Sequence, residues 1–481
     1  MHGPAPAAPP PPGTPLDPAA AELADAVRQF KRAAVLVVGD AMLDRYVFGN
    51  VSRISPEAPV PVLAVEREVA LPGGAGNVVR NLTALGAAVA FVSVVGDDQA
   101  GSDLTGLVGG QPNVEPWLLV QGGRATTTKT RFVAAGQHLL RADHEQLAPI
   151  HPRLADRLVR IASDAVAATT VLVLSDYQKG VLAGDTPARL IAAAHAAGRR
   201  VVVDPKGGDH HRYAGADLIV PDCAELAEAT GRPTGTAAEI AAAAEALRAA
   251  HGFGAVLVVR GEAGVTLADA DGTRHLAGDV AEVIDPAGAA DAVVAVAAAG
   301  LAAGLPLAVV ARLGALAAGI VLGKTGIAVV REDEFLEALT PGRLAARKQV
   351  NRVQAAERVE RWRRAGWRVG FVADPLNAAG GVADLALLVL ARSWCDRLVV
   401  GTAAGDAARA AALAELSAVD LVAGFGPGGP LELIRLLRPD VLIQDPAGAP
   451  ESLAGGDLVQ EWGGTVRRPA PAVAVESIPA G

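Results

Sequence analysis

Short runs of β-branched and other apolar residues alternate along the chain with longer stretches rich in alanine and leucine. Several of the short runs show no alternation of polar and apolar positions, which is typical of parallel strands covered on both faces. The pattern therefore predicts an α/β fold in which helices pack on a parallel sheet. The runs behind this prediction begin at Ala33 and read AAVLVVGD, AVAFVSVVGD, TVLVLSDY, RRVVVDPKG, ADLIVPD and AVLVVRG.

Two segments break this rhythm, and we interpret them as strands of a smaller sheet. Residues 44–68 and 117–143 are richer in alternating valine, arginine and threonine. Most strands of the main sheet end in Asp, Gly or Ser, and ligands bind at the carboxyl ends of strands in open parallel sheets. We expect the smaller sheet to form a lid beside that edge.

The same pattern divides the chain into four parts. Residues 1–30 are expected to form a disordered Pro/Ala-rich tail and a short helix, because dense proline favours extended chain. Residues 31–340 form the first α/β domain, and the Arg- and Gln-rich residues 341–366 are interpreted as a linker helix. A second, smaller doubly wound domain is predicted over residues 367–481.

Composition narrows the range of partners. Only 3% of the residues are aromatic although 51% are hydrophobic, so the core must consist largely of Ala, Val and Leu. A net charge of −9 argues against a nucleic-acid-binding surface or a polybasic membrane patch. Cys223 and Cys395 are too far apart in sequence to suggest a disulfide framework or a cysteine zinc site. No secretory signal or membrane span is predicted, and we expect a cytoplasmic protein.

The densest glycine cluster, LPGGAGNVVRNLTALGA at residues 71–87, opens a predicted helix with Asn77 near its start. Glycines let backbone N–H groups approach a ligand closely, and a helix N-terminus favours anions and oxygen-rich ligands. A tight strand-to-helix turn without a ligand is the alternative interpretation.

Residues 285–293, DPAGAADAV, place a turn of small residues before a long apolar helix, with Asp291 in its first turn. Such a carboxylate often serves only as a partner of the helix dipole. In a kinase, the N–H groups of Ala289, Ala290 and Asp291 would instead hold the transferring phosphoryl group. The Asp291 carboxylate would then remove the proton of the acceptor hydroxyl.

Seven segments in this order resemble the ribokinase-like (PfkB) sugar kinases: GDAMLDRY, SRISPEAPVPVL, PGGAGNVVRNLTALGA, VVGDDQAG, LSDYQKG, VVVDPKG and DPAGAAD. SRISPEAPVP, SDYQKG and DPKG followed by RYAGADLIVPD resemble more closely the kinase half of the bifunctional D-glycero-β-D-manno-heptose-7-phosphate kinases / heptose-1-phosphate adenylyltransferases. The resemblance covers residues 33–335. It implies a ribokinase-like α/β sandwich with a small β lid.

The resemblance also implies roles for individual residues. Sugar hydroxyls would be held by Asp44, Gly73, Gly74 and Asn77, and the substrate phosphate by Lys179 and by Arg131 or Arg141. Catalysis would fall to Asp291 with Gly288, Ala289 and Ala290. Asp222 and Glu225 would order magnesium through water. The residues expected around ATP are Asp204, Lys206, Asp222, Glu225, Arg260, Gly261, Gly264 and Asp285.

Three positions depart from the family pattern. Ala290 replaces a glycine in the Gly-Ala-Gly-Asp turn and is acceptable only with a negative φ. Pro286 replaces a threonine, which removes a donor and a hydroxyl near the anion-binding turn. Asp222 replaces an asparagine and adds negative charge near the metal. We still expect an active kinase.

In the same bifunctional family the C-terminal half is a Rossmann-like nucleotidyltransferase with a His-x-Gly-His motif. Here Asn377 and Gly381 stand where the histidines would be, and neither supplies an imidazole. A Lys-Gly-Gly-Asp-like turn is replaced by QDPAGA at residues 444–449, and the Ser/Thr-rich end is reduced to AVESIPAG. We therefore predict a degenerate cytidylyltransferase-like domain that keeps its fold and has lost adenylyl transfer, with nucleotide binding or dimerisation as alternatives.

Together with these motifs, the resemblance implies ATP-dependent, magnesium-assisted phosphorylation of the anomeric hydroxyl of a heptose 7-phosphate or a related phosphosugar, in ADP-heptose biosynthesis. An exposed lid sheet suggests a homodimer. One alternative is a bifunctional kinase and adenylyltransferase with a variant C-terminal site. Another is a non-catalytic sensor of sugar phosphate or nucleotide.

Overall fold

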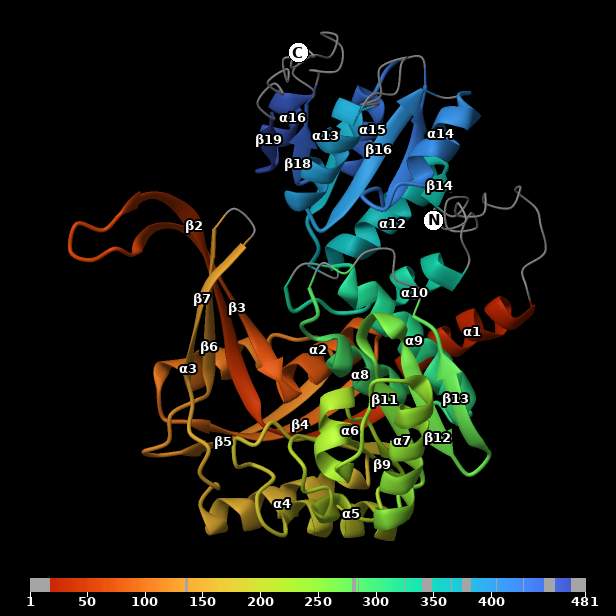
Figure 1. The fold of residues 1–481 in the computed structure, drawn as a ribbon. Helices are drawn as coiled ribbons and strands as arrows, with labels where there is room; N and C mark the ends of the chain where they lie inside the picture. Colours follow the sequence, from red (N-terminus) through yellow and green to blue (C-terminus); the bar gives the residue numbers. More distant parts are fainter. Residues whose placement is uncertain are drawn as a thin grey trace, which may run out of the picture. The chain divides into compact units, whose positions relative to one another are not determined.

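The computed structural model describes residues 18–134, 137–278, 283, 285–324, 326–339, 348–364, 366–373, 382–403, 405–426, 428–444 and 455–468. The chain divides into two compact units, one over Asp17–Leu339 and one from Thr340 onward. Each unit contains its own sheet with helices on both faces (Figure 1). Of residues 1–30, predicted as a tail and a short helix, residues 1–17 lie outside the described residues, and α1 (Pro18–Gln29) is the short helix.

The described part of the first unit is built on a nine-stranded sheet in the order β13-β12-β11-β10-β9-β8-β1-β4-β5. Neighbouring strands pair in parallel except for the antiparallel β12 and β13 at one edge. The strands are β1 (Ala34–Gly39), β4 (Ala88–Gly96), β5 (Val114–Gln121), β8 (Val171–Ser175), β9 (Arg200–Asp204), β10 (Leu218–Ile219), β11 (Ala255–Val259), β12 (Val265–Asp269) and β13 (Gly272–Leu276).

Both faces of this sheet are covered, which explains why its strands carry few polar residues. In β1, Val35 and Val37 pack into the core on one face, and Leu36 and Val38 into the core on the other. The first core also holds side chains of α1, α2 (Ala75–Ala84), α3 (Gln99–Gly109), α8 (Ala289–Ala302), α9 (Leu307–Leu322) and α10 (Glu332–Leu339). The second holds side chains of α4 (Pro152–Val166), α5 (Thr186–Ala196), α6 (Cys223–Thr230) and α7 (Ala237–His251).

A separate four-stranded sheet, in the order β3-β2-β6-β7, forms the predicted small sheet. It contains β2 (Ala41–Ile54), β3 (Pro61–Gly74), β6 (Thr128–Ala134) and β7 (Gln137–His144), and the β2–β3 hairpin extends beyond the other two strands (Figure 1). One assignment was wrong. Trp117 lies in β5, which pairs in parallel with β4 at the edge of the main sheet and not in the small one.

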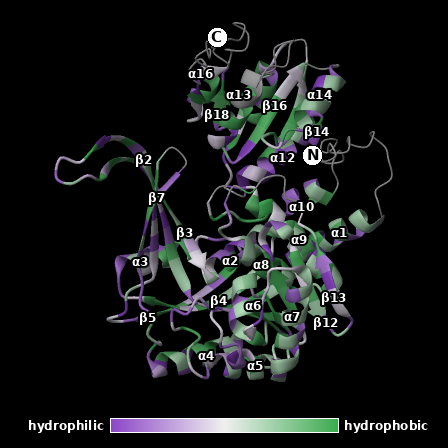
Figure 2. Ribbon diagram, viewed as in Figure 1, coloured by the Kyte–Doolittle hydropathy of each residue, from purple (hydrophilic) through white to green (hydrophobic). Residues whose placement is uncertain are grey.

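The described part of the second unit contains a six-stranded parallel sheet in the order β14-β17-β16-β15-β18-β19. The predicted linker helix is part of this unit, because Ala355 and Val359 of α12 are buried in its core. Hydrophobic residues concentrate in the central strands of the main sheet of each unit, whereas the lid strands β2 and β7 carry many hydrophilic residues (Figure 2). The elements are β14 (Gln349–Val350), α12 (Arg352–Arg364), β15 (Val369–Ala373), α13 (Val382–Ser393), β16 (Arg397–Ala403), α14 (Ala407–Ala414), β17 (Leu421–Phe425), α15 (Leu431–Leu437), β18 (Val441–Ile443), α16 (Gly456–Glu461) and β19 (Thr465–Arg467).

Among the described helices, none combines the length and apolar character needed to cross a bilayer.

Candidate active site

The predicted base, Asp291, is the third residue of α8 and is buried. One of its carboxylate oxygens accepts a hydrogen bond from Asn77 Nδ2 at 2.6 Å, and the other accepts one from the hydroxyl of Tyr177. Asn77 is itself the third residue of α2. The first turns of two helices therefore bring together a residue predicted to hold the sugar and the predicted base.

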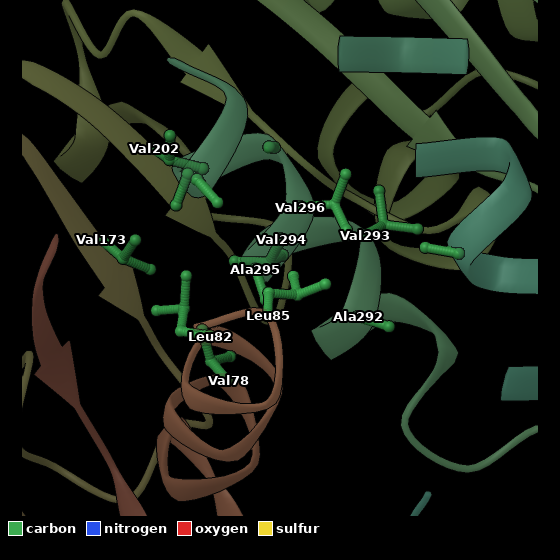
Figure 3. Close-up of a cluster of buried hydrophobic side chains, with 14 of the residues drawn as sticks. Val78, Leu82, Leu85, Val173, Val202, Ala292, Val293, Val294, Ala295 and Val296 are labelled. Atoms are coloured by element: carbon green, nitrogen blue, oxygen red, sulfur yellow. The ribbon is translucent and has the colours of Figure 1, made fainter. Parts of the chain in front are cut away.

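Apolar packing holds these two helices against each other. Val78, Leu82 and Leu85, along α2 and at its C-terminal end, belong to the same buried cluster as the segment Ala292–Val296 of α8 (Figure 3). Val173 of β8 and Val202 of β9 complete the cluster from the sheet (Figure 3). Since Asn77 and Asp291 directly precede these packed segments, the core sets the distance between their side chains.

Arg80 orients the Asn77 amide. Its Nη1 donates to Asn77 Oδ1 at 2.8 Å and to the carbonyl oxygen of Ile327 at 3.0 Å, which turns Asn77 Nδ2 toward Asp291. Arg80 was not among the site residues predicted from the sequence. The available signal was its spacing of three residues after Asn77, which places both side chains on one face of the helix.

The lid strands β2 and β3 contribute the other predicted sugar-binding residues. The Asp44 carboxylate on β2 is buried and forms an ion pair with Arg131 of β6. A Cβ on Gly73 would lie 1.6 Å from Asp44 Oδ2, so only a glycine leaves room for this carboxylate. Gly74, the last residue of β3 and the N-cap of α2, has φ +57°, as expected for a tight strand-to-helix turn.

Burial raises the pKa of Asp291, while its hydrogen bonds from Asn77 and Tyr177 and the charge of Lys206 oppose that effect. Burial also raises the pKa of Asp44 against the opposing charge and hydrogen bond of Arg131. A buried carboxylate with a raised pKa is a stronger base than an exposed one and suits proton removal.

The turn before α8 leaves backbone donors available. Gly288 has φ +84° and gives the helix no side-chain cap, so the N–H groups of Ala289, Ala290 and Asp291 have no helical acceptor. Ala290 has a negative φ, which satisfies the condition for alanine at this position. The arrangement can bind an anion at the end of the helix next to the base.

Asp285 holds this turn in place. Its Oδ1 accepts the N–H of Ala287 at 2.9 Å, and its Oδ2 accepts the N–H of Gly326 at 3.1 Å. The carboxylate predicted to contact ATP thus joins two segments of the protein. Pro286 beside it is exposed and donates no hydrogen bond.

Four residues predicted around the nucleotide lie together beside β9. Lys206 forms an ion pair with Glu225, and Asp222 and Glu225 form the capping box of α6, each accepting the backbone N–H of the other at 2.8 Å. Asp204 is buried, accepts a hydrogen bond from Ser175 Oγ at 3.0 Å, and has its pKa raised by burial. The charges of Asp204 and Glu225 outweigh burial and raise the pKa of Lys206.

The turn containing the last predicted ATP residues lies beside this group. Asp222 pairs with Val259, which directly precedes Arg260. Gly261 and Gly264 have φ of +60° and +87°, and a Cβ on Gly264 would lie 2.1 Å from the carbonyl oxygen of Leu276. The two glycines therefore allow the tight connection between β11 and β12.

Asp222 and Glu225 fit a water-mediated magnesium site better than direct coordination, because both carboxylates already accept hydrogen bonds and Glu225 also pairs with Lys206. Across the residues that the structure describes, no three Asp, Glu, His or Cys side chains form a cage for a metal. Protein-bound Mg²⁺ usually keeps several waters and uses substrate phosphates as ligands, which this arrangement allows.

The cations predicted to bind the substrate phosphate each have a carboxylate partner. Lys179 pairs with Glu145 at 2.8 Å, Arg141 pairs with Asp143 at 3.0 Å, and Arg131 pairs with Asp44. Arg131 and Arg141 face each other across β6 and β7. A cavity of 630 Å³ lies between the lid strands and the segments 285–286 and 326–327.

Tyr177 and Asp40 were also missed by the sequence analysis. Each stands within two residues of the end of a central strand, Tyr177 after β8 and Asp40 after β1, where ligand-binding residues are expected in such sheets. The register aligns these strand ends, since Gly39 lies opposite Ser175 and Ser175 opposite Asp204.

The positions that matter most in the second unit, Asn377 and Gly381, lie outside the described residues, as do residues 445–449 of the QDPAGA segment and the final AVESIPAG. Gln444, the first residue of QDPAGA, is buried and accepts a hydrogen bond from Arg468 Nε at 2.9 Å. Both residues line a cavity of 470 Å³ with Asp457 and Gln460.

The family model described as pfkB family carbohydrate kinase matches residues 32–333. A bifunctional protein HldE of Acidiphilium cryptum is 54% identical over 466 residues, which cover 92% of this chain and 94% of the relative. A bifunctional protein HldE of Paramagnetospirillum magneticum is 46% identical with the same coverage.

Solved structures match part of the chain. Ribokinase of Arabidopsis thaliana in complex with ribose and ATP has 21% identity and a TM-score of 0.52, over 64% of this chain and 98% of the ribokinase chain. Phosphofructokinase-2 of Escherichia coli with substrates and products has 20% identity and a TM-score of 0.53, with the same coverage. These matches confirm the predicted ribokinase-like fold class.

Proposed function

Since the chain belongs to the pfkB family of carbohydrate kinases and, over most of its length, to the family of bifunctional HldE proteins, we propose that it phosphorylates the anomeric hydroxyl of a heptose 7-phosphate with ATP. The observation that carries the proposal is the 2.6 Å hydrogen bond between Asn77 and Asp291. It joins a residue of the glycine-rich loop to a buried carboxylate at an anion-binding helix end.

In the proposed reaction, the Asp291 carboxylate accepts the proton of the anomeric hydroxyl. The hydroxyl oxygen forms a bond to the γ-phosphorus while the bond to the β–γ bridging oxygen breaks, and ADP leaves. The N–H groups of Ala289, Ala290 and Asp291 stabilise the negative charge on the transferring group. Asn77, Asp44, Gly73 and Gly74 hold the sugar, so the hydroxyl stays oriented toward the base.

On the nucleotide side, Asp204, Lys206 and the turn of Arg260, Gly261 and Gly264 would surround ATP. Lys206 would neutralise phosphate charge after leaving Glu225, its partner in this structure. Magnesium would be held through water by Glu225 and Asp222, and it would supply further neutralisation of the phosphates.

The lid would complete the site around the phosphorylated end of the sugar. Arg131, Arg141 and Lys179 would exchange their present carboxylate partners for the substrate phosphate. Closure of the lid would exclude water and favour transfer to the sugar. The exposed strand β7 at the lid edge supports the proposal of a homodimer, since a second copy would cover that edge.

The replacement Asp291→Asn tests the proposal. We expect the rate of sugar-dependent ADP release to fall by about 10²–10⁴-fold, because the amide cannot accept the proton. Product mass, measured after incubation with free and phosphorylated sugars, identifies the acceptor. Equal and negligible turnover by both proteins, with sugar phosphate still bound by both, would instead favour the non-catalytic sensor.

A second candidate function concerns the second unit. The relatives are named bifunctional proteins, so the predicted loss of adenylyl transfer draws no support from them and rests on three changes in the sequence: Asn377 and Gly381, the QDPAGA segment and the AVESIPAG end. The alternative is that a site without the two histidines still transfers adenylate from ATP to a sugar 1-phosphate, releasing pyrophosphate.

Incubation of the whole protein with heptose 1-phosphate and ATP distinguishes these cases. Formation of ADP-heptose with an equal amount of pyrophosphate would establish the second activity. Its absence, in a preparation whose kinase activity is intact, would support the predicted loss.

A further inference from the structure

The hydroxyl of Tyr177 donates a hydrogen bond to Asp291 Oδ1, the carboxylate oxygen that Asn77 does not hold. Both oxygens of the proposed base therefore carry a donor from the protein itself. A sugar hydroxyl approaching Asp291 to give up its proton must form the same kind of hydrogen bond that Tyr177 already makes. While no sugar is bound, the Tyr177 hydroxyl therefore makes the hydrogen bond to Asp291 that the hydroxyl of the sugar would make.

The main chain around Tyr177 is firmly anchored. The buried carboxylate of Asp40 accepts the N–H groups of Tyr177, Lys179 and Val181 at 2.9, 3.0 and 3.0 Å. Asp176 accepts the N–H of Gln178 at 2.7 Å, and Gln178 has φ +55°. Because Asp40 and Asp176 are buried, they hold the backbone of this loop in place.

Tyr177 also lies between the two halves of the proposed site. Lys206 Nζ, on the nucleotide side, is 5.5 Å from the centre of its ring, and Asp291 lies at its hydroxyl. Burial, reinforced by the nearby charges of Asp291 and Asp204, raises the pKa of the phenol well above its ordinary value. The hydroxyl therefore keeps its proton at neutral pH and acts as a donor to the carboxylate.

We propose that Tyr177 is a positioning residue that orients the Asp291 carboxylate and keeps water from it until the hydroxyl of the sugar takes its place. This inference rests on the proposed kinase function. It adds that the Tyr177 hydroxyl keeps ATP from being hydrolysed by water when no sugar is bound. Without the hydroxyl, water can bind to Oδ1 beside the γ-phosphate. Water would then give its proton to Asp291, its oxygen would bond to the γ-phosphorus, and ADP and phosphate would form.

The test compares Tyr177→Phe with Tyr213→Phe. Tyr213 is a matched control, because it is buried and its hydroxyl also donates to an aspartate, Asp176, which has no role in the proposed phosphoryl transfer and whose other oxygen still accepts the N–H of Gln178 in the variant. We expect Tyr177→Phe to raise ADP release without sugar about tenfold, in line with general-base catalysis acting on water, and Tyr213→Phe to leave it unchanged. The ratio of sugar-dependent to sugar-independent turnover should fall accordingly.

The pH profile gives a readout that a purely structural role would not move. The Tyr177 hydrogen bond lowers the pKa of Asp291, so its removal should shift the acid limb of the kcat/KM profile to higher pH. Melting temperature checks the fold of each variant. Tyr177→Met, which also lacks the hydroxyl, replaces Tyr177→Phe if the latter is unstable.

The outcomes separate the two proposals. An active wild-type kinase whose folded Tyr177 variants keep both the wild-type turnover ratio and the wild-type acid limb would overturn the role of Tyr177 alone. A wild-type protein that releases no ADP with any phosphosugar would overturn the kinase function and this inference together.

Discussion

Gly73 and Gly288 leave the space in which two functional side chains lie. A Cβ at position 73 would meet the Asp44 carboxylate at 1.6 Å, and one at position 288 would meet Asn77 Nδ2 at 3.0 Å. The contribution of both glycines is therefore the absence of a side chain. In the sequence they are indistinguishable from the glycines of ordinary turns.

A buried histidine gives a prediction at the same scale. His210 is almost fully buried, and within the described structure neither ring nitrogen has a hydrogen-bond partner. Burial lowers its pKa to about 4, whereas an unfolded histidine titrates near 6.5. The unfolded chain therefore binds a proton first as the pH falls, and the folded state loses stability between about pH 6.5 and pH 4.

We expect the free energy of unfolding to fall by about 2–3 kcal/mol between pH 7.5 and pH 4.5 through His210. Urea unfolding at both pH values measures this change. His210→Phe should remove that part of the pH dependence, whereas His144→Phe, on exposed β7, should retain it. Equal pH dependence in the two variants would contradict the assignment.

The sequence was sufficient to identify functional residues at the start of a helix that follows a turn of small residues. Asp291 and Asn77 could be selected because each follows a small-residue turn at a helix start. For Tyr177 and Arg80 the sequence offered only a position beside a strand end and a spacing from Asn77, because their roles depend on partners 114 and 247 positions away, Asp291 and Ile327. Such partners are defined only once the strands and helices have packed.

At the scale of elements, the N-terminus of α8 depends on the left-handed backbone of Gly288. Gly304, just beyond the other end of the same helix, has a similar φ of +77° and nothing within 4 Å of an added Cβ. The two positions therefore differ in their surroundings but not in their backbone conformation.

Gly288→Ala and Gly304→Ala should each cost about 1–2 kcal/mol of stability, because alanine is strained at positive φ. Only Gly288→Ala should also lower kinase turnover, by about 10–100-fold, since its methyl group displaces Asn77. Chemical denaturation and ADP release measure the two effects. Comparable activity losses in both variants would show that strain alone is responsible.

The main α/β pattern was predictable from the sequence. The sheet to which β5 belongs and the unit to which α12 belongs were not. The alternation in residues 117–143 indicated strands but could not reveal that β5 pairs with β4, because register is a tertiary property. The Arg-rich composition of α12 suggested a solvated linker, yet Ala355 and Val359 are buried in the core of the second unit, and Ala356 and Trp362 pack against it.

At the scale of the whole molecule, the two units have separate hydrophobic cores. Leu172 is fully buried in the first unit and Leu398 in the second. Each core is a candidate for independent cooperative unfolding. We expect two transitions in differential scanning calorimetry of the full chain.

Replacement of each leucine by alanine tests this expectation. Leu172→Ala should lower the free energy of unfolding of the first unit by about 2–5 kcal/mol and leave the transition of the second unit unchanged. Leu398→Ala should have the same effect on the second unit and leave the first unchanged. A non-hydrolysable ATP analogue at 100 times its Kd, added with sugar phosphate, should raise the free energy of unfolding of the first unit by about 2.7 kcal/mol. The first unit is identified by the transition that Leu172→Ala lowers. A single transition that both variants lower would contradict independent units.

The packing of α2 on α8 has a consequence for anyone who wishes to change the substrate of this protein. Asn77 and Asp291 lie on the two helices that pack against each other through Val78 and Val293. A change of side-chain volume at Val78 or Val293 would therefore misalign Asn77 and Asp291 and lower the reaction rate before it unfolded the protein. Lid residues that line the cavity without a role in the proposed reaction, such as Phe48 and Val69, belong to a different sheet and can vary without that penalty. Libraries for new sugars therefore belong at these lid positions, with Asp44, Gly73 and the helix pair kept constant.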